Sequence, residues 1–294
     1  MLPSTVVRVG FLTHLLWDRY GPFWATLARA AGAEVVLPAP ADVVARLTDP
    51  RVAAASAVAF RLAIAAALAL EDVDLLVVPR LNPEDGGDRG AGQDPWVADL
   101  PTMLGRTVPG LPPVWPVPAE LDRPVESAAV SFLRRLTPDA GILRRAWSQH
   151  RAEARPPRRS AVTPAAPAGA ATVALVGQPW WATPAVATLF AGPDERMVGP
   201  YAWTPAGLRD EGRRLDPGLI DTDAEALGAV RRCARSATVA RLRLVVDGGS
   251  GSDLWLARRA TEIAPRQLEA VDLRGQPEPE RVIEALLLPA GRPS

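Results

Sequence analysis

Short apolar runs that do not alternate with polar residues recur along this chain, and they constrain its fold more than any other feature. In the first half they are VVRVGFL (Val6–Leu12), AEVVLP (Ala33–Pro38) and VDLLVVP (Val73–Pro79). Strands buried on both faces of a parallel sheet have this pattern, whereas a strand with one solvated face alternates. Helix-length segments separate the runs, which predicts right-handed crossovers and a doubly wound parallel sheet.

Two of the intervening segments are expected to be helices. Asp18–Ala31 places Phe23, Leu27 and Ala30 on one helical face. Ala53–Leu70 is almost wholly apolar, but Arg61 lies in its middle, and an arginine at a bilayer centre costs about 2.5–3.5 kcal/mol. We therefore interpret this segment as a buried or half-buried helix of a soluble protein rather than a membrane span.

The second half repeats the pattern of the first without repeating its sequence. Strands are expected at Ala171–Gly177, Arg241–Asp247 and QLEAVDL, and Asp221–Ser236 is expected to be a helix that opens with a capping box of Thr222 and Glu225. The Pro-, Ala- and Arg-rich stretch between the halves is typical of a linker. We predict an N-terminal α/β lobe (1–153), a linker (154–170) and a C-terminal α/β lobe (171–294), both lobes Rossmann-like.

Composition excludes several kinds of chemistry. All 33 basic residues are arginine, so no lysine can form a Schiff base or complete a phosphate-binding P-loop. Cys233 is the only cysteine, which rules out an intramolecular disulfide and a thiolate cage built by one chain. The formal net charge is zero, which gives no electrostatic argument for nucleic acid. With no signal-peptide pattern at the start, we expect a cytoplasmic protein without a bound metal or cofactor.

Several motifs, in order, resemble the 2-hydroxyacyl-CoA dehydratase and CoA-enzyme-activase-associated family. The opening segment VRVGFLTHLLWDRYGPFWATLARAAGAEVVLP supplies Tyr20, Pro22, Trp24, Gly32, Val35 and Val36. The helix and strand that follow supply Asp74, Pro79 and Arg80, and TVALVGQPWW resembles the start of the family's second lobe. The element DPWVADLP matches a Cys-Pro element of the family, with Asp94 where the cysteine would be. The resemblance implies two Rossmann-like lobes and a ligand crevice.

The departures from the family concern its iron–sulfur cluster. Members that bind a cluster supply cysteines from three places, which here read Ala55-Ser56-Ala57, Asp94-Pro95 and Gly248-Gly249-Ser250-Gly251. Iron–sulfur clusters are held by thiolates, and Ser and Asp are poor substitutes. The family's radical dehydration is therefore not expected here.

The best local candidate for a ligand site is the Gly-rich turn DGGSGSD after the strand at 241–247. It comprises Gly248, Gly249, Ser250, Gly251 and Ser252 and leads into a helix. Glycines let a ligand approach the backbone, and the free N–H groups of a helix start attract anions. The alternative interpretation is a tight turn without a ligand.

Other candidates also follow predicted strands, where ligands bind in open α/β sheets. Gln178 and Trp180 follow the first strand of the second lobe, and Trp180 could stack on a flat ligand or simply pack in the core. His14 and Arg80 follow two strands of the first lobe. His14 could act as an acid or base, or be a structural hydrogen-bonding residue. Arg80 could bind a carboxylate or phosphate, or cap the loop. Asp94 is also expected to cap a helix over Asp94–Gly105. The acidic loop at 84–88 has no recognisable metal spacing.

Three functional hypotheses follow. The first is a family relative without a cluster that binds a small anionic ligand, such as an acyl-CoA, between its lobes in a regulatory or structural role. The second is a non-catalytic partner of a homologous, cluster-bearing subunit. The third is an enzyme with non-redox chemistry that uses His14, Arg80 or Asp94.

Overall fold

The computed structural model describes residues 6–83, 94–155, 169–199, 203–275 and 279–287. The chain divides into two units, of which the first comprises Met1–Leu81 and Asp99–Pro157 and the second Asn82–Ala98 and Arg158–Ser294. The segment 82–98 thus belongs with the second unit, although it precedes half of the first unit in sequence. Most of the predicted linker and the acidic loop at 84–88 lie outside the described residues, and the predicted domain boundaries stay a prediction.

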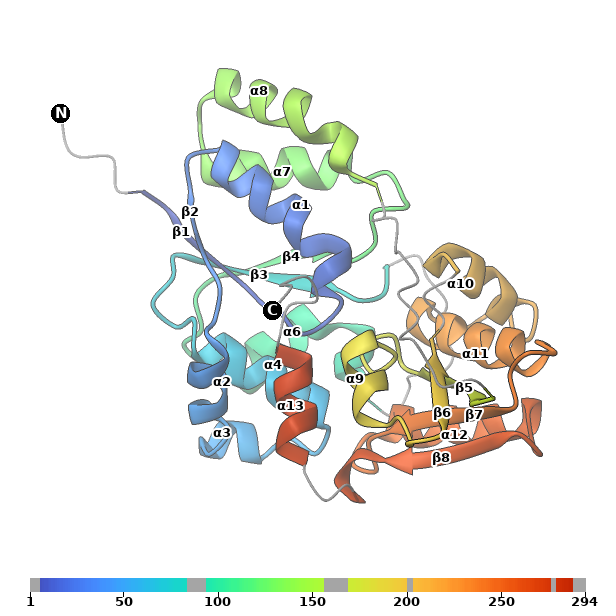
Figure 1. Ribbon diagram of the computed structural model, residues 1–294. Helices are drawn as coiled ribbons and strands as arrows, with labels where there is room; N and C mark the ends of the chain where they lie inside the picture. Colours follow the sequence, from blue (N-terminus) through green and yellow to red (C-terminus); the bar gives the residue numbers. More distant parts are fainter. Residues whose placement is uncertain (1–5, 84–93, 156–168, 200–202, 276–278, 288–294) are drawn as a thin grey trace. The chain divides into compact units, whose positions relative to one another are not determined.

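The first unit contains a four-stranded, all-parallel sheet with the strand order β2-β1-β3-β4. Its strands are β1 (Arg8–Phe11), β2 (Glu34–Val36), β3 (Leu75–Arg80) and β4 (Val114–Pro118). Five of the six residues of β3 are buried, as expected for a central strand that is covered on both faces. Figure 1 shows α1, α7 and α8 on one side of this sheet and α2, α3, α4 and α6 on the other. The helices are α1 (Trp17–Ala30), α2 (Pro40–Arg46), α3 (Pro50–Ala53), α4 (Val58–Leu68), α6 (Leu100–Thr107), α7 (Glu126–Leu136), α8 (Ala140–His150) and the 3₁₀ turn η1 (Arg151–Glu153).

The aromatic residues of the opening motif hold α1 against its own sheet. The Tyr20 hydroxyl donates to the carbonyl of Leu12 at 2.6 Å, and Trp24 Nε1 donates to the carbonyl of Pro118 at 3.2 Å. Trp24 also meets Phe132 of α7 edge to face, with ring centroids 5.6 Å apart. These side chains satisfy their polar atoms inside the core, so they serve packing in this unit.

The second unit has the same topology, with an all-parallel sheet in the order β6-β5-β7-β8. Its strands are β5 (Ala171–Gly177), β6 (Glu195–Val198), β7 (Arg241–Val246) and β8 (Leu268–Asp272). Alternate residues of β5 and β7, including Val176 and Leu244, belong to a buried cluster with α10, α11 and α12. From the opposite face, Arg243 donates to the carbonyl of Phe190 at the end of α9. The helices are α5 (Pro95–Ala98), α9 (Pro184–Leu189), α10 (Pro205–Arg213), α11 (Asp221–Ala234), α12 (Gly251–Ile263), α13 (Pro279–Leu287) and the 3₁₀ turn η3 (Leu273–Gly275).

Helices α10 and α11 cross at backbone contact. A Cβ on Gly212 would lie 1.9 Å from the carbonyl oxygen of Ala224, and one on Gly228 would lie 1.9 Å from that of Leu208. Two glycines, one from each helix, therefore allow an approach that any side chain would prevent.

The predicted fold class is confirmed, since both units are α/β with all-parallel sheets flanked by helices, consistent with two Rossmann-like lobes. Two local predictions differ from the structure. The helix expected over 94–105 is divided into α5 and α6, because Asp99 caps α6 by accepting from Thr102 N and Pro101 lacks the N–H that a continuous helix needs. The capping box expected at Thr222 is wrong, because α11 follows Ile220 without a side-chain cap of its own.

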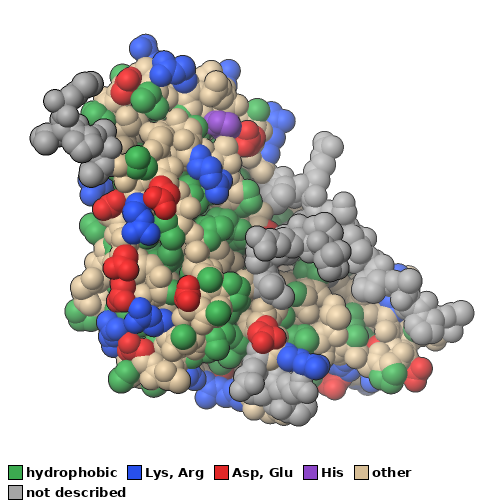
Figure 2. All heavy atoms as spheres, turned by 60° about the vertical axis from the view of Figure 1, so that its left-hand side comes forward, with side chains coloured by type: hydrophobic (Ala, Val, Ile, Leu, Met, Phe, Trp, Pro, Cys, Tyr) green, Lys and Arg blue, Asp and Glu red, His purple; other side chains and the backbone are tan. Residues whose placement is uncertain are grey.

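On the face drawn in Figure 2, arginines and acidic side chains are interspersed. Among the described residues, no helix is both long enough and apolar enough to span a bilayer.

Candidate ligand sites

The carboxyl edge of the second sheet is the position where a ligand is expected in this topology. The chain leaves β5 toward β6 on one side and returns to β7 on the other, so the strand order reverses between β5 and β7. Ligands of open α/β sheets bind beside such a reversal, outside the carboxyl ends of the strands. The loops that begin at Gln178 and Asp247 both start here, and so do helices α11 and α12.

Asp94 occupies the N-terminus of α12. Its Oδ2 accepts from Ser250 Oγ at 2.6 Å and from Ser252 N at 2.8 Å, and Ser250 Oγ in turn accepts from Asp253 N at 3.1 Å. Asp94 is 8% exposed and Ser252 is fully buried. A carboxylate from the chain itself therefore takes the place that an external anion would take at a helix start.

Asp253 in the first turn of α12 lies among other buried acids. Its Oδ2 accepts from Trp181 Nε1 at 2.8 Å and from Asp247 N at 2.9 Å. Burial raises the pKa of Asp253 to about 7, and the negative charges of Asp247 and Asp94 act in the same direction. Among the described residues, no group of three or more His, Cys, Asp or Glu side chains could hold a metal ion.

Replacing Asp253 with asparagine is expected to remove a fall in stability with rising pH. The pKa of Asp253 is raised from 3.8 to about 7 on folding. The contribution of Asp253 to the free energy of unfolding is therefore complete below pH 3.8 and is lost as the pH rises through about 7. The asparagine side chain keeps an oxygen that can accept from Trp181. Urea unfolding of both proteins at about pH 5 and about pH 8 measures the difference.

Asp49→Asn is the matched control for this experiment. Asp49 is half-buried, and its pKa is lowered to about 2, first of all by its hydrogen bond with Arg51. Its contribution is complete above 3.8 and falls only as pH drops through about 2. An Asp253→Asn protein with the same pH slope as wild type would show that Asp253 is already ionised in the fold.

Gln178 and the two tryptophans that follow β5 are buried within the second unit. Gln178 is fully buried, and its Nε2 donates to Asp223 Oδ1 at 2.7 Å. Trp180 packs against Trp96 of α5, with ring centroids 5.4 Å apart and planes tilted by 52°. Gln178 Oε1 and Trp180 Nε1 have no hydrogen-bond partner among the described residues. The predicted stacking residue Trp180 therefore packs on a tryptophan of the same unit.

Asn82 supplies a hydrogen-bond acceptor to α11, the other helix that begins at this edge. Asn82 Oδ1 accepts from Thr222 N at 3.1 Å, in the first turn of α11, while Asn82 Nδ2 donates to the carbonyl of Val97 at 2.7 Å. Asn82 and Asp94 thus supply side-chain acceptors to α11 and α12 respectively. This explains why Ile220 can precede α11 without a polar side chain.

The glycines of the predicted ligand turn bond to neighbouring acids. Gly248 N donates to Asp272 Oδ1 at 3.0 Å, and Gly249 N donates to Asp247 Oδ1 at 2.9 Å. Arg274 Nε donates to the same Asp247 oxygen at 2.8 Å. The structure therefore brings Asp94, Gln178, Trp180 and the 248–252 turn to one edge of one unit, in a closely hydrogen-bonded and largely buried arrangement.

His14 and Arg80 belong to the first unit, where His14 follows the central strand β1 and Arg80 ends the central strand β3. His14 is 7% exposed, and burial lowers its pKa to about 4, although a weak interaction with the backbone of Ala59 opposes the shift. The ring is therefore neutral at pH 7. Arg80 is the last residue of β3 and is partly exposed. These two predicted site residues therefore belong to a different unit from Asp94, Gln178, Trp180 and the 248–252 turn.

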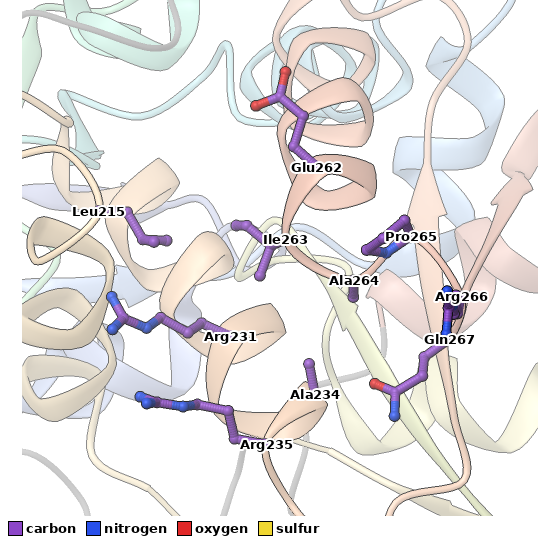
Figure 3. Close-up of a pocket in the computed structure, with 10 residues that line it drawn as sticks. All are labelled: Leu215, Arg231, Ala234, Arg235, Glu262, Ile263, Ala264, Pro265, Arg266 and Gln267. Carbon is purple, nitrogen blue, oxygen red and sulfur yellow. The ribbon is translucent and has the colours of Figure 1, made fainter.

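An open pocket of about 660 Å³ lies in the second unit, near the carboxyl ends of α11 and α12. In a parallel α/β unit these helix ends lie at the amino edge of the sheet, opposite the reversal point. Figure 3 shows its lining, which is Leu215, Arg231, Ala234, Arg235, Glu262, Ile263, Ala264, Pro265, Arg266 and Gln267. Five of these ten are apolar and three are arginines, which is a typical lining for a ligand with an apolar body and an acidic group.

None of the pocket's arginines was among the residues predicted from sequence. The available signal was the pair Arg231 and Arg235, four residues apart and therefore on one face of a helix. Like charges at this spacing destabilise a helix, so they indicate a nearby counter-ion or an anionic ligand. The counter-ion in the structure is Glu211, whose Oε1 lies 3.0 Å from Arg231 Nε and 3.5 Å from an Arg235 nitrogen.

Comparisons of the chain with protein-family models, with curated proteins and with solved structures found no match. The resemblance to the dehydratase family therefore stays a prediction.

Proposed function

We propose that this chain binds a small organic anion, in a regulatory or structural role and without redox chemistry of its own. The observation that carries the proposal is the arginine-lined pocket of the second unit. Its volume of about 660 Å³ falls within the range of about 300–1,000 Å³ that is usual for ligand sites. Apolar residues such as Ile263 and Pro265 can cover the body of a ligand, and guanidinium groups can bind its acidic group.

The chemistry of Cys233 supports the non-redox part of this proposal. It is the only cysteine in the chain and is 1% exposed. Burial raises its pKa to about 12, so the thiolate form that a metal or cluster requires is strongly disfavoured. The carboxylate of Asp94, at the position of a family cysteine, is bonded to Ser250 and Ser252.

Arg235→Ala is expected to weaken anion binding about tenfold, since a charge-assisted hydrogen bond contributes about 1.5 kcal/mol. The Arg235 side chain is 69% exposed, so its removal leaves the core intact. Titration calorimetry with hexanoate, benzoate and phenyl phosphate measures the effect. Arg258→Ala is the control, because Arg258 is an exposed arginine of α12 that does not line the pocket. If wild type binds none of these anions, or if both variants bind them like wild type, the pocket is not the anion site.

A further inference from the structure

The pocket carries an excess of positive charge. Its lining contains three arginines and one glutamate, in a chain whose formal net charge is zero. The glutamate, Glu262, is paired with Arg259 of the same helix, so it neutralises little of the pocket's charge. The carboxyl ends of α11 and α12 each carry the equivalent of about half a negative charge, which offsets about one of the three positive charges. An excess of about two remains.

Glu211 lowers this excess to a little more than one positive charge, because its single negative charge is shared with Arg214 outside the pocket lining. It is 8% exposed, and besides Arg231 and Arg235 its Oε2 accepts from Arg214 at 2.7 Å. One carboxylate is thus shared among three guanidinium groups, two of which line the pocket. Glu211 orients Arg231 and Arg235 without neutralising both of them.

The arginines stand on two sides of an apolar middle. In Figure 3, Arg231 and Arg235 extend side by side from α11 on one side, while Arg266 and Gln267 lie on the other side, in the segment that leads into β8. Ile263, Ala264 and Ala234 lie between them in this view. A compact anion would engage one side, whereas an elongated molecule with an acidic group near each end would engage both.

We infer that the ligand is an elongated organic dianion, with one acidic group bound by Arg231 and Arg235, the second bound by Arg266, and an apolar body between them. This inference rests on the proposed function and specifies the chemical class of its ligand. The apolar lining selects against inorganic anions, and the two-sided charge selects against monocarboxylates of equal length.

Matched pairs of acids test this inference by calorimetry on the full chain. The probes are succinate, adipate and sebacate against butyrate, hexanoate and decanoate, which differ within each pair by one terminal carboxylate. We expect the best dicarboxylate to bind about tenfold more tightly than its monocarboxylate partner, as one additional charge-assisted contact implies. Equal affinities within every pair would overturn the dianion inference and leave the proposed function standing. Absence of binding by all six acids would overturn the dianion inference, and absence of binding by benzoate and phenyl phosphate as well would overturn the proposed function.

The variant Arg266→Ala tests whether Arg266 binds the second acidic group of the ligand. Arg266 is exposed, so the variant is expected to fold like wild type. It should lower the affinity for the dicarboxylate to that for the monocarboxylate, and leave the monocarboxylate affinity unchanged. If Arg266→Ala keeps the full preference for the dicarboxylate, the second group does not bind at this side and the inference fails. Arg258→Ala should retain the wild-type preference.

Discussion

Gly228→Ala is expected to destabilise the second unit by about 3 kcal/mol, at the upper end of the usual range for overpacking. The added methyl group would lie 1.9 Å from the carbonyl oxygen of Leu208 and 2.9 Å from the backbone nitrogen of Gly212. Neither neighbour can rotate away, because both are backbone atoms of α10. The helices must separate, and separation opens the buried cluster that includes Leu227, Val230 and Leu256. Urea unfolding measures the loss, and hydrogen exchange of the α10 and α11 amides locates it.

A second glycine provides the matched control. Gly105 lies in α6 and is exposed, and a Cβ built on it meets nothing within 4 Å. Gly105→Ala should therefore stabilise the protein by about 0.5–1 kcal/mol, as the helix propensity of alanine implies. Gly212→Ala should resemble Gly228→Ala, since its Cβ would lie 1.9 Å from the carbonyl oxygen of Ala224. If Gly228→Ala were as well tolerated as Gly105→Ala, the close crossing of α10 and α11 would be wrong.

The strands of this protein could be predicted from sequence because burial on both faces leaves a local signature. Runs such as LLVVP in β3 and VALVG in β5 are apolar at consecutive positions, and both are central strands. The crossover rule then supplies the parallel topology. By contrast, β6 and α10 were not predicted. The edge strand β6 reads ERMV, with charged residues at its start, and α10 contains two internal glycines, Gly207 and Gly212.

The candidate site was predictable as a set of residues but not as a set of contacts. Asp94 and the 248–252 turn were each singled out, yet the sequence gives no reason to pair a carboxylate with a hydroxyl 156 positions away. For the same reason Thr222 was assigned a local capping box, although its N–H is bonded to Asn82, 140 positions away. Local sequence patterns indicate which polar groups need hydrogen-bond partners, and the tertiary fold determines which residues supply them.

Asp94→Ala is expected to cost about 3 kcal/mol of stability, because it leaves Ser250 Oγ and Ser252 N without their acceptor in a buried site. It should also lower the pKa of Asp253, since the charge of Asp94 contributes to raising it. Urea unfolding as a function of pH reports both effects. The loss in stability appears at every pH, and the decline assigned to Asp253 ends at a lower pH than in wild type.

Asp139→Ala is the control for Asp94→Ala, because Asp139 is an ordinary helix cap in an exposed position. Asp139 caps α8 in an exposed position by accepting from Gly141 N and Ile142 N, so its removal should cost only about 1 kcal/mol. A larger loss for Asp94→Ala means that Asp94 stabilises the N-terminus of α12 and acts as a structural anion. An equal or smaller loss means that the N-terminus of α12 does not depend on Asp94, and that this carboxylate is free for the ligand-binding role predicted from sequence.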